Sequence, residues 1–412
     1  MNRLPAEIIN MISEYYKKAK IQITSLDKLL YSHRKFLNID FNYEKLNKYN
    51  TEFQIETLYN IPILPIPIIN KHFRKIEFDD YFDQEINNLP KNITHLTFGD
   101  KFNQNVDNLP KNLTHLTFGN KFNQSVDTLP KNIIFLVFGD RFNQQVDNLP
   151  EKITDLTFKW LFNQEIDNLP KNIINLTFGY DFNQKINNLP KNINYLNFGD
   201  DFDQNVDDLP VNITKLRFGW KFNQTIDKLP KNINHLILGY NFDQKIDNLP
   251  KNTINLFLGN KFNQKVDTLP ENIKTLFFGH EFNQKVDHLP QNITNLTLGY
   301  KFNKEINNLP KSITHLTLGY DFNQKVDTLP MNITNLTFGY SFDQTVDHLP
   351  INITNLIFGS EFNQNIDNLP QNITNLTFGY YFNQKIDNLP KKVKCLILGS
   401  NFKKIKFNKN NK

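Results

Sequence analysis

Residues 101–120 read KFNQNVDNLPKNLTHLTFGN, and residues 361–380 read EFNQNIDNLPQNITNLTFGY in the same register. This 20-residue pattern runs without insertion from Tyr81 to Ser400, which makes sixteen consecutive units. Repetition at a fixed period of this kind is typical of solenoids, in which each coil buries the apolar face of its neighbours. The sequence therefore predicts a repeat β-solenoid of sixteen 20-residue coils, and we number the positions of each coil 1 to 20.

The apolar positions of the repeat indicate its core and its strand. Position 2 is always Phe (Phe222 is an example), position 6 Ile or Val, positions 9 and 16 Leu, and position 18 Phe or Leu. Position 13 is Ile, Leu or Val except at Thr253, so positions 13, 16 and 18 form the pattern L-x-x-L-x-L. Since positions 16 and 18 alternate with period 2, we expect one short parallel strand per coil, at positions 14–18.

Proline and glycine each keep to one position of the repeat. Sixteen of the 20 prolines occupy position 10. Proline has no N–H to give to a ladder, so we expect this position to lie outside the sheet. All 15 glycines occupy position 19, and only one unit departs from this, with Lys159. A glycine fixed at a strand end predicts either a positive φ or close approach of the next coil.

The polar positions divide into regular and variable ones. Position 3 is Asn or Asp and position 12 is Asn in 13 units, which favours ladders that satisfy backbone amides between coils. Positions 15, 17 and 20 vary, and their aromatic and Arg residues are of the types that dominate protein interfaces. Burial against neighbouring coils is the alternative role for these aromatics. The candidate target-binding residues are Phe135, Trp160, Tyr195, Arg217, Trp220, Tyr240 and Phe257.

The distribution of charge argues against a nucleic-acid binder. The chain carries a formal charge of +5, but residues 81–400 hold 30 basic and 32 acidic side chains, whereas residues 401–412 hold five basic and none acidic. A nucleic-acid-binding solenoid would place a basic stripe along its long surface. The basic C-terminal tail therefore accounts for most of the net charge.

No sequence motif indicates catalysis, so we expect neither an enzyme nor a cofactor, metal or small-molecule substrate. The isolated glycines exclude a phosphate-binding loop, and the single Cys395 has no partner for a metal cluster. His95 and His115 share position 15 and are expected to stack as exposed polar side chains. No apolar run suggests a membrane span or a signal peptide, so we expect an intracellular, cytoplasmic protein.

The repeat FNQxxDNLPxNIxxLxFG resembles the FNIP repeat, a variant of the leucine-rich repeat, over residues 81–400. It is also similar to the 20-residue bacterial leucine-rich type. The resemblance implies a leucine-rich-repeat-like solenoid that binds proteins. The leucine-rich consensus places its ladder Asn three residues after the last strand leucine, whereas this chain has its Asn two positions later. Whether the coils form a curved horseshoe or a straighter solenoid is therefore open.

The N-terminal stretch LPAEIINMI, residues 4–12, resembles the opening of an F-box. That resemblance implies a small α-helical module over residues 1–48 that binds a Skp-type adaptor of a cullin-based (SCF-type) ubiquitin ligase. It also implies an origin in amoebae or in the giant viruses that infect them, and in the viral case a host cytoplasmic location. The residues implied in adaptor binding are Leu4, Pro5, Ile8, Ile9 and Ile12.

Four regions follow from these patterns: an F-box-like module (1–48), a linker with a degenerate first coil (49–80), the repeats (81–400) and a basic tail (401–412). The predicted function is a non-catalytic protein that recruits a target protein to the ligase. The alternative is a repeat scaffold with no link to ubiquitin, in which residues 1–80 serve only as an N-terminal cap.

Overall fold

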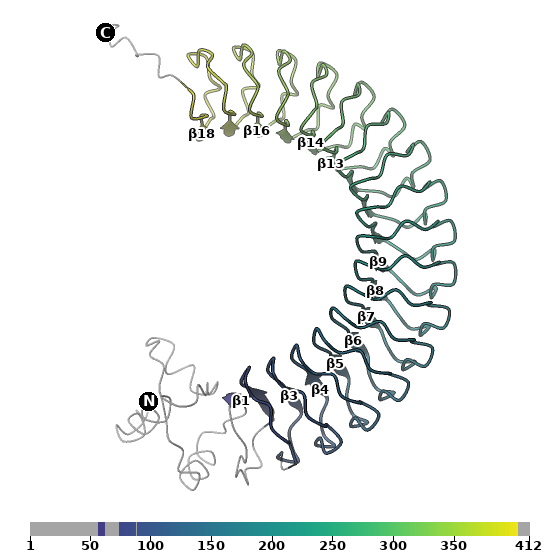
Figure 1. The fold of residues 1–412 in the computed structure, drawn as a ribbon. Helices are drawn as coiled ribbons and strands as arrows, with labels where there is room; N and C mark the ends of the chain where they lie inside the picture. Colours follow the sequence, from purple (N-terminus) through teal and green to yellow (C-terminus); the bar gives the residue numbers. More distant parts are fainter. Residues whose placement is uncertain (1–56, 62–73, 88, 403–412) are drawn as a thin grey trace, which may run out of the picture. The chain divides into compact units, whose positions relative to one another are not determined.

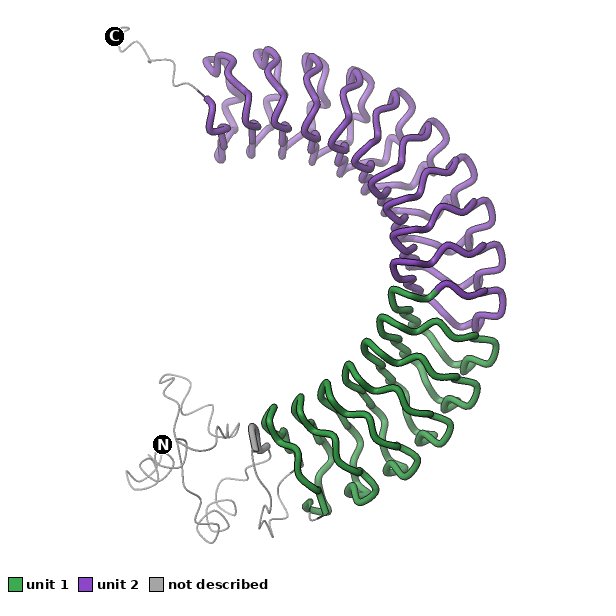
Figure 2. The backbone as a smooth tube through the Cα atoms, viewed as in Figure 1, with its two compact units in different colours: residues 1–202 green, residues 203–412 purple. Residues whose placement is uncertain are grey.

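The computed structural model describes residues 57–61, 74–87 and 89–402 of the chain. These residues fall into two compact units, divided between Phe202 and Asp203 (Figure 2). Every regular element within them is a short β-strand (Figure 1). The fold is a parallel β-solenoid of about sixteen 20-residue coils, as the repeat predicts.

In unit 1 each strand pairs in parallel with its neighbours in the chain, from β1 to β8. Nothing in the repeat pattern indicates β1, which pairs with β2 through a register shift between Leu58 and Ile61. The strands are β1 (Thr57–Ile61), β2 (Lys75–Phe78), β3 (His95–Thr97), β4 (His115–Thr117), β5 (Phe135–Val137), β6 (Asp155–Thr157), β7 (Asn175–Thr177) and β8 (Tyr195–Asn197).

In unit 2 the strands again pair in parallel and in sequence order, each residue facing the residue 20 positions later. The strands are β9 (Lys215–Arg217), β10 (His235–Ile237), β11 (Asn255–Phe257), β12 (Thr275–Phe277), β13 (Asn295–Thr297), β14 (His315–Thr317), β15 (Asn335–Thr337), β16 (Asn355–Ile357), β17 (Asn375–Thr377) and β18 (Cys395–Ile397).

Within each unit the strands lie along the concave side of the coils and the turns lie around the outer side (Figure 1). The coils of each unit therefore follow a curved path. The outward strand positions 15 and 17 face the concave side, while position 16 points into the core.

The strands of the repeats are shorter than predicted, occupying positions 15–17 instead of 14–18. Hydrogen bonding nevertheless continues one residue beyond each end. In a typical coil the amides of Thr314 and His315 both donate to the carbonyl of Thr294, and the amide of Leu318 donates to Thr337 in the following coil. The regular ladder ends at the turn of Gly319, and one more bond between coils follows, from the amide of Asp321 to the carbonyl of Tyr300.

The core consists of the predicted apolar positions. In the coil that begins at Lys301, the side chains at positions 2, 6, 9, 13, 16 and 18 are all less than 10% exposed: Phe302, Ile306, Leu309, Ile313, Leu316 and Leu318. Phenylalanines at position 2 stack between coils with ring centroids about 6 Å apart, as between Phe302 and Phe322 at 6.1 Å. Thr253, the polar exception at position 13, is fully buried and donates its hydroxyl to the carbonyl of Pro250 at 2.8 Å.

Proline at position 10 lies outside the sheet, as its missing N–H requires, and begins a turn. In the coil of Pro310 its carbonyl accepts a hydrogen bond from the amide of Ile313 at 3.2 Å. The turn brings the chain back from the outer side toward the next strand. Its geometry recurs in nearly every described coil.

Position 19 requires glycine because the backbones of neighbouring coils approach closely there. Of the two reasons expected from the sequence, a positive φ and close approach, the second applies. A Cβ built on Gly299 would lie 1.7 Å from the carbonyl oxygen of Gly279. The obstructing backbone belongs to the preceding coil, whereas the sequence suggested the following one. Lys159 supplies the equivalent carbonyl beneath Gly179.

Polar ladders join the coils along their outer side, as positions 3 and 12 predict. The side chain of Asn283 accepts a hydrogen bond from the amide of Asn303 in the next coil at 3.0 Å. At position 12, Asn332 donates to the carbonyl of Lys311 at 2.9 Å. These bonds satisfy backbone groups in the turns that would otherwise lack a hydrogen-bond partner.

Candidate interaction surface

The outward positions of the concave strand face differ from coil to coil. Position 16 is Leu in every coil, whereas positions 15 and 17 most often read Asn and Thr but depart from that pattern in several strands. Because neighbouring strands pair in register, each departure lies directly beside the equivalent residue of the adjacent coil. Chemical differences at these positions change the surface and leave the core unaltered.

Two stacked histidines begin the varied part of this face in unit 1. The rings of His95 and His115 lie 4.0 Å apart and nearly parallel, as their shared position predicts. Each ring nitrogen Nδ1 lies 2.9 Å from the hydroxyl of the preceding residue, Thr94 or Thr114. Burial lowers the pKa of both histidines, and the nearby Lys75 lowers both further. Repulsion from His115 also lowers the pKa of His95, while Asp155 partly offsets the effect at His115.

The lowered pKa values of His95 and His115 predict that the folded chain loses stability as the pH falls. A histidine whose pKa is lower in the folded state is protonated first in the unfolded chain. Its contribution to stability is therefore fully present above the unfolded pKa of about 6.5 and is lost as pH falls below it. Replacing both rings, His95→Asn and His115→Asn, should reduce the difference between urea midpoints measured at pH 7.5 and pH 5. An unchanged difference would contradict the lowered pKa values.

Aromatic and acidic side chains continue the face of unit 1. Phe135 follows His115 with ring centroids 5.8 Å apart. Asp155 lies next, where its carboxylate accepts hydrogen bonds from Thr154 and Asn175, each at 2.6 Å. Tyr195 lies on β8, half-buried. The face thus changes within a few coils from imidazole to phenyl to carboxylate.

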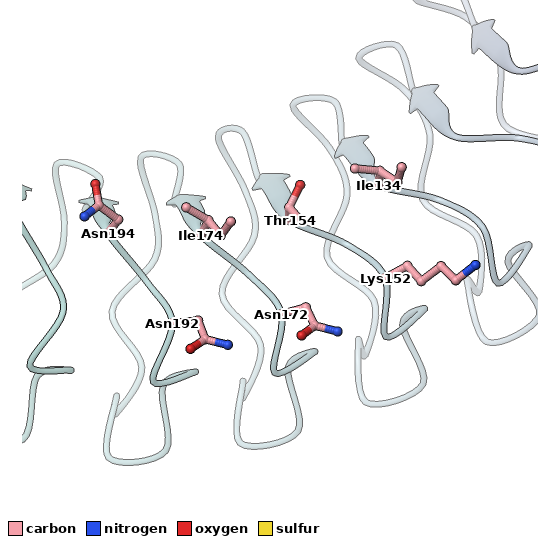
Figure 3. Close-up of a pocket in the computed structure, with 7 residues that line it drawn as sticks. All are labelled: Ile134, Lys152, Thr154, Asn172, Ile174, Asn192 and Asn194. Carbon is pink, nitrogen blue, oxygen red and sulfur yellow. The ribbon is translucent and has the colours of Figure 1, made fainter.

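An open hollow of about 740 Å³ lies beside the starts of these strands (Figure 3). One row of its lining comes from position 14, where Ile134 and Ile174 are 40% and 43% exposed, and a second row comes from position 12, including Lys152. Most coils carry Thr at position 14, and Thr114 donates its hydroxyl to the carbonyl of Thr94 at 3.0 Å. The two isoleucines cannot make that bond and instead present apolar surface to solvent.

The same face in unit 2 is basic and aromatic on its first strands and neutral on its later ones. Lys215 and Arg217 are exposed on β9, and Phe257 and Phe277 follow on β11 and β12. From β13 to β17 the outward residues are Asn, His, Thr and one Ile. The amide side chains of Asn335, Asn355 and Asn375 form a hydrogen-bonded ladder there.

Aromatic residues at position 20 line the exits of the strands. Trp160 is 63% exposed, with its ring tilted against Tyr180 at 6.1 Å. Trp220 is 52% exposed and stacks on Tyr240 at 4.2 Å. A longer stack in unit 2 was not among the candidate residues, with centroids 4.3 to 4.5 Å apart along His280, Tyr300, Tyr320 and Tyr340. Recurrence of aromatic residues at position 20 in consecutive coils is the sequence signal that could have found it.

The candidate target-binding residues therefore lie in two rows, one on the strand face and one at the strand exits. Unit 1 holds Phe135, Trp160 and Tyr195, and unit 2 holds Arg217, Trp220, Tyr240 and Phe257. Trp220 and Tyr240 are brought into contact, and Phe257 packs against Phe277. The residues implied in Skp-type binding, Leu4, Pro5, Ile8, Ile9 and Ile12, lie outside the described residues.

Neither a metal site nor a membrane span is found among the described residues. Within 57–61, 74–87 and 89–402, no three His, Cys, Asp or Glu side chains gather as they would around a metal ion. In the same ranges no helix has the length and apolar character to cross a membrane. Cys395 is an exposed free thiol on β18.

Comparison with known proteins gives one family and several solved structures. The FNIP Repeat model matches in twelve segments that together cover residues 59–160, 162–201 and 222–401. Among proteins of curated function, none matches the chain.

The solved structure of CroV588, described as a novel circular LRR protein, is 38% identical, with a TM-score of 0.69. The match covers 83% of this chain and 62% of CroV588, so this chain spans less than two thirds of that protein.

Two bacterial structures overlap more loosely. YopM from Yersinia enterocolitica is 15% identical with a TM-score of 0.40, over 96% of this chain and all of that one. InlJ from Listeria monocytogenes is 10% identical with a TM-score of 0.47, over 87% and 76% of the two chains. These scores are too low to support an argument about this chain.

Proposed function

Because this chain belongs to the FNIP repeat family, we propose that it is a non-catalytic adaptor that recruits a target protein to a cullin-based ubiquitin ligase. The solenoid binds the target on its concave strand faces. Residues 1–48 bind a Skp-type adaptor, and the protein acts in the cytoplasm. The leucine-rich-repeat-like solenoid is consistent with a protein-interaction scaffold, and this supports the part of the proposal that concerns target binding.

One observation supports target binding above the others. The core positions are almost invariant from coil to coil, while the outward strand positions carry aromatic, basic and acidic side chains in only some coils. Folding alone would be served by Asn and Thr at every coil, as β15 and β17 demonstrate. The departures therefore support a role for this face in binding a partner.

The link to ubiquitin rests on the sequence of residues 4–12, and association with a Skp-type adaptor tests it. The full chain should co-purify with the adaptor. Ile8→Asp/Ile12→Asp should abolish that association, because it places charges on the apolar stripe that Leu4, Ile8, Ile9 and Ile12 would form on a helix. Asn10→Asp/Ser13→Asp adds the same charge to the same stretch off the stripe and should retain binding. Equal urea transitions of the solenoid would show that the repeats remain folded in both variants.

Failure of the unaltered chain to bind the adaptor would reject the ligase role. The second candidate function, a scaffold without a ubiquitin link whose first 80 residues cap the array, would then stand. Pairing of β1 with β2 favours that candidate, since it extends the sheet ahead of the first repeat.

A further inference from the structure

The chemical division of the concave face in unit 2 points to a particular kind of partner. On β9 to β12 the outward residues are Lys215, Arg217, His235, Ile237, Asn255, Phe257, Thr275 and Phe277, which we call the β9–β12 patch. None of these eight residues is acidic. The core beneath the patch is the same as elsewhere, because Leu216, Leu236, Leu256 and Leu276 are all buried.

The patch has a cationic end and an apolar end. Lys215 and Arg217 are both exposed at β9. At position 17 the following coils carry Ile237, Phe257 and Phe277, the last of which is 39% exposed. Register pairing places these three side chains in one row, and the two phenyl rings lie 6.2 Å apart.

His235 belongs to the apolar part at neutral pH. Burial, followed by repulsion from Lys215, lowers its pKa, so the imidazole is uncharged there. Its ring packs against Phe257 with centroids 5.5 Å apart. The positive charge is thus confined to the two side chains of β9.

The phenyl rings of Phe257 and Phe277 at position 17 are not needed for the fold. In β13, β14, β15 and β17 the same position 17 holds Thr, and those strands pair in the same register. A phenyl ring that remains exposed contributes little to the stability of the fold. It contributes strongly to binding affinity when a partner covers it. The stacked Trp220 and Tyr240 lie at the exits of β9 and β10 and extend the apolar surface.

We propose that the β9–β12 patch binds a protein segment in which carboxylates are followed by aromatic or aliphatic side chains. The carboxylates pair with Lys215 and Arg217, and the apolar side chains cover Ile237, Phe257 and Phe277. Strands about 4.8 Å apart place β9 and β12 about 14 Å from each other, which an extended segment spans in about four residues. This inference rests on the proposed function and specifies the chemistry of its target.

A nucleic acid fits the patch less well. Phosphate backbones need cations that recur along the bound strand. Within the β9–β12 patch the cations lie on β9 only, and the lowered pKa of His235 leaves the outward positions of β10 to β12 uncharged at neutral pH. A segment with carboxylates at one end and apolar side chains at the other matches the cationic and apolar ends of the patch better than a phosphate backbone does.

The test is selection of a random dodecapeptide library on the full chain, with a parallel selection on Lys215→Glu/Arg217→Glu. We expect peptides that join Asp or Glu to Phe, Trp or Leu to be enriched on the unaltered chain and not on the variant. The strongest peptide, resynthesised with a fluorescent label, should bind at least ten-fold more weakly to Lys215→Glu/Arg217→Glu and to Phe257→Ala/Phe277→Ala. Its affinity should also fall as NaCl is raised.

Lys265→Glu/Lys285→Glu is the matched control, since it makes the same charge change at exposed residues of position 5. It should bind the peptide as the unaltered chain does. No enrichment, enriched peptides without carboxylates, or equal binding by Lys215→Glu/Arg217→Glu would overturn the inference. Binding of a labelled twelve-nucleotide oligothymidine with the same sensitivity to these variants would also overturn it, in favour of nucleic acid.

Failure of this inference and failure of the proposed function have different signatures. If peptide binding behaves as expected while the chain does not bind a Skp-type adaptor, the patch stands and the ligase role falls. If proximity labelling in cells yields the same target with the unaltered chain and with Lys215→Glu/Arg217→Glu, target recruitment stands and the patch assignment falls.

Discussion

Phe222→Ala is expected to lower the free energy of unfolding by about 3–5 kcal/mol. The ring is fully buried, stacks on Phe218 with centroids 3.7 Å apart, and lies 6.1 Å from Phe242 in the next coil. Its removal leaves a cavity that the surrounding coils cannot fill, because their backbones are fixed by the ladder hydrogen bonds. Each coil is stabilised mainly by its neighbours, so the loss should weaken both interfaces of the altered coil.

Phe277→Ala is the matched control for this cavity. It removes the same side chain from the exposed strand face, where the ring is 39% exposed, and should shift the urea midpoint far less. Hydrogen exchange of amides in β9 to β11 would detect local opening even if unfolding is not two-state. Similar midpoints for the two variants would mean that position 2 does not carry the core.

Much of the fold could be predicted from the sequence because one unit is repeated. A single Phe or Pro is ambiguous, but a Phe at position 2 and a Pro at position 10 of every coil have only one consistent placement in a stacked array. The strand length was overestimated for a physical reason. Thr314 and Leu318 do make ladder hydrogen bonds, but the turn at Gly319 ends regular pairing, leaving three strand residues. β1 was not predicted because its segment does not follow the repeat.

The candidate site was harder to predict. The sequence identifies which positions vary, and hence the rows that hold Arg217 and Phe257, but it does not give the ring contacts. Whether neighbouring aromatics stack depends on ring orientation, as the contrast between the tilted Trp160–Tyr180 pair and the parallel Trp220–Tyr240 pair demonstrates. The repeat pattern places position 14 in the strand and so does not predict the hollow beside Ile134 and Ile174.

Gly299→Ala should destabilise the solenoid even though it adds one methyl group. The new Cβ would lie 1.7 Å from the carbonyl oxygen of Gly279, whereas such atoms essentially never approach within 3.0 Å. The obstructing atom is backbone and cannot rotate away, so the two coils must separate. We expect a cost at or above the upper end of the roughly 1–3 kcal/mol typical of overpacking.

Lys311→Ala is a suitable control, since it alters an exposed side chain of the next coil and retains the carbonyl that accepts from Asn332. Its urea midpoint should match that of the unaltered chain, while Gly299→Ala should unfold at lower urea. Separation of the coils that hold Gly279 and Gly299 would also weaken the hydrogen bond from the amide of Phe278 to the carbonyl of Thr297, so the Phe278 amide should exchange faster. Unchanged exchange and an unchanged midpoint in Gly299→Ala would mean that the coils can move apart freely, and close backbone approach would then not explain why 15 coils carry glycine at this position.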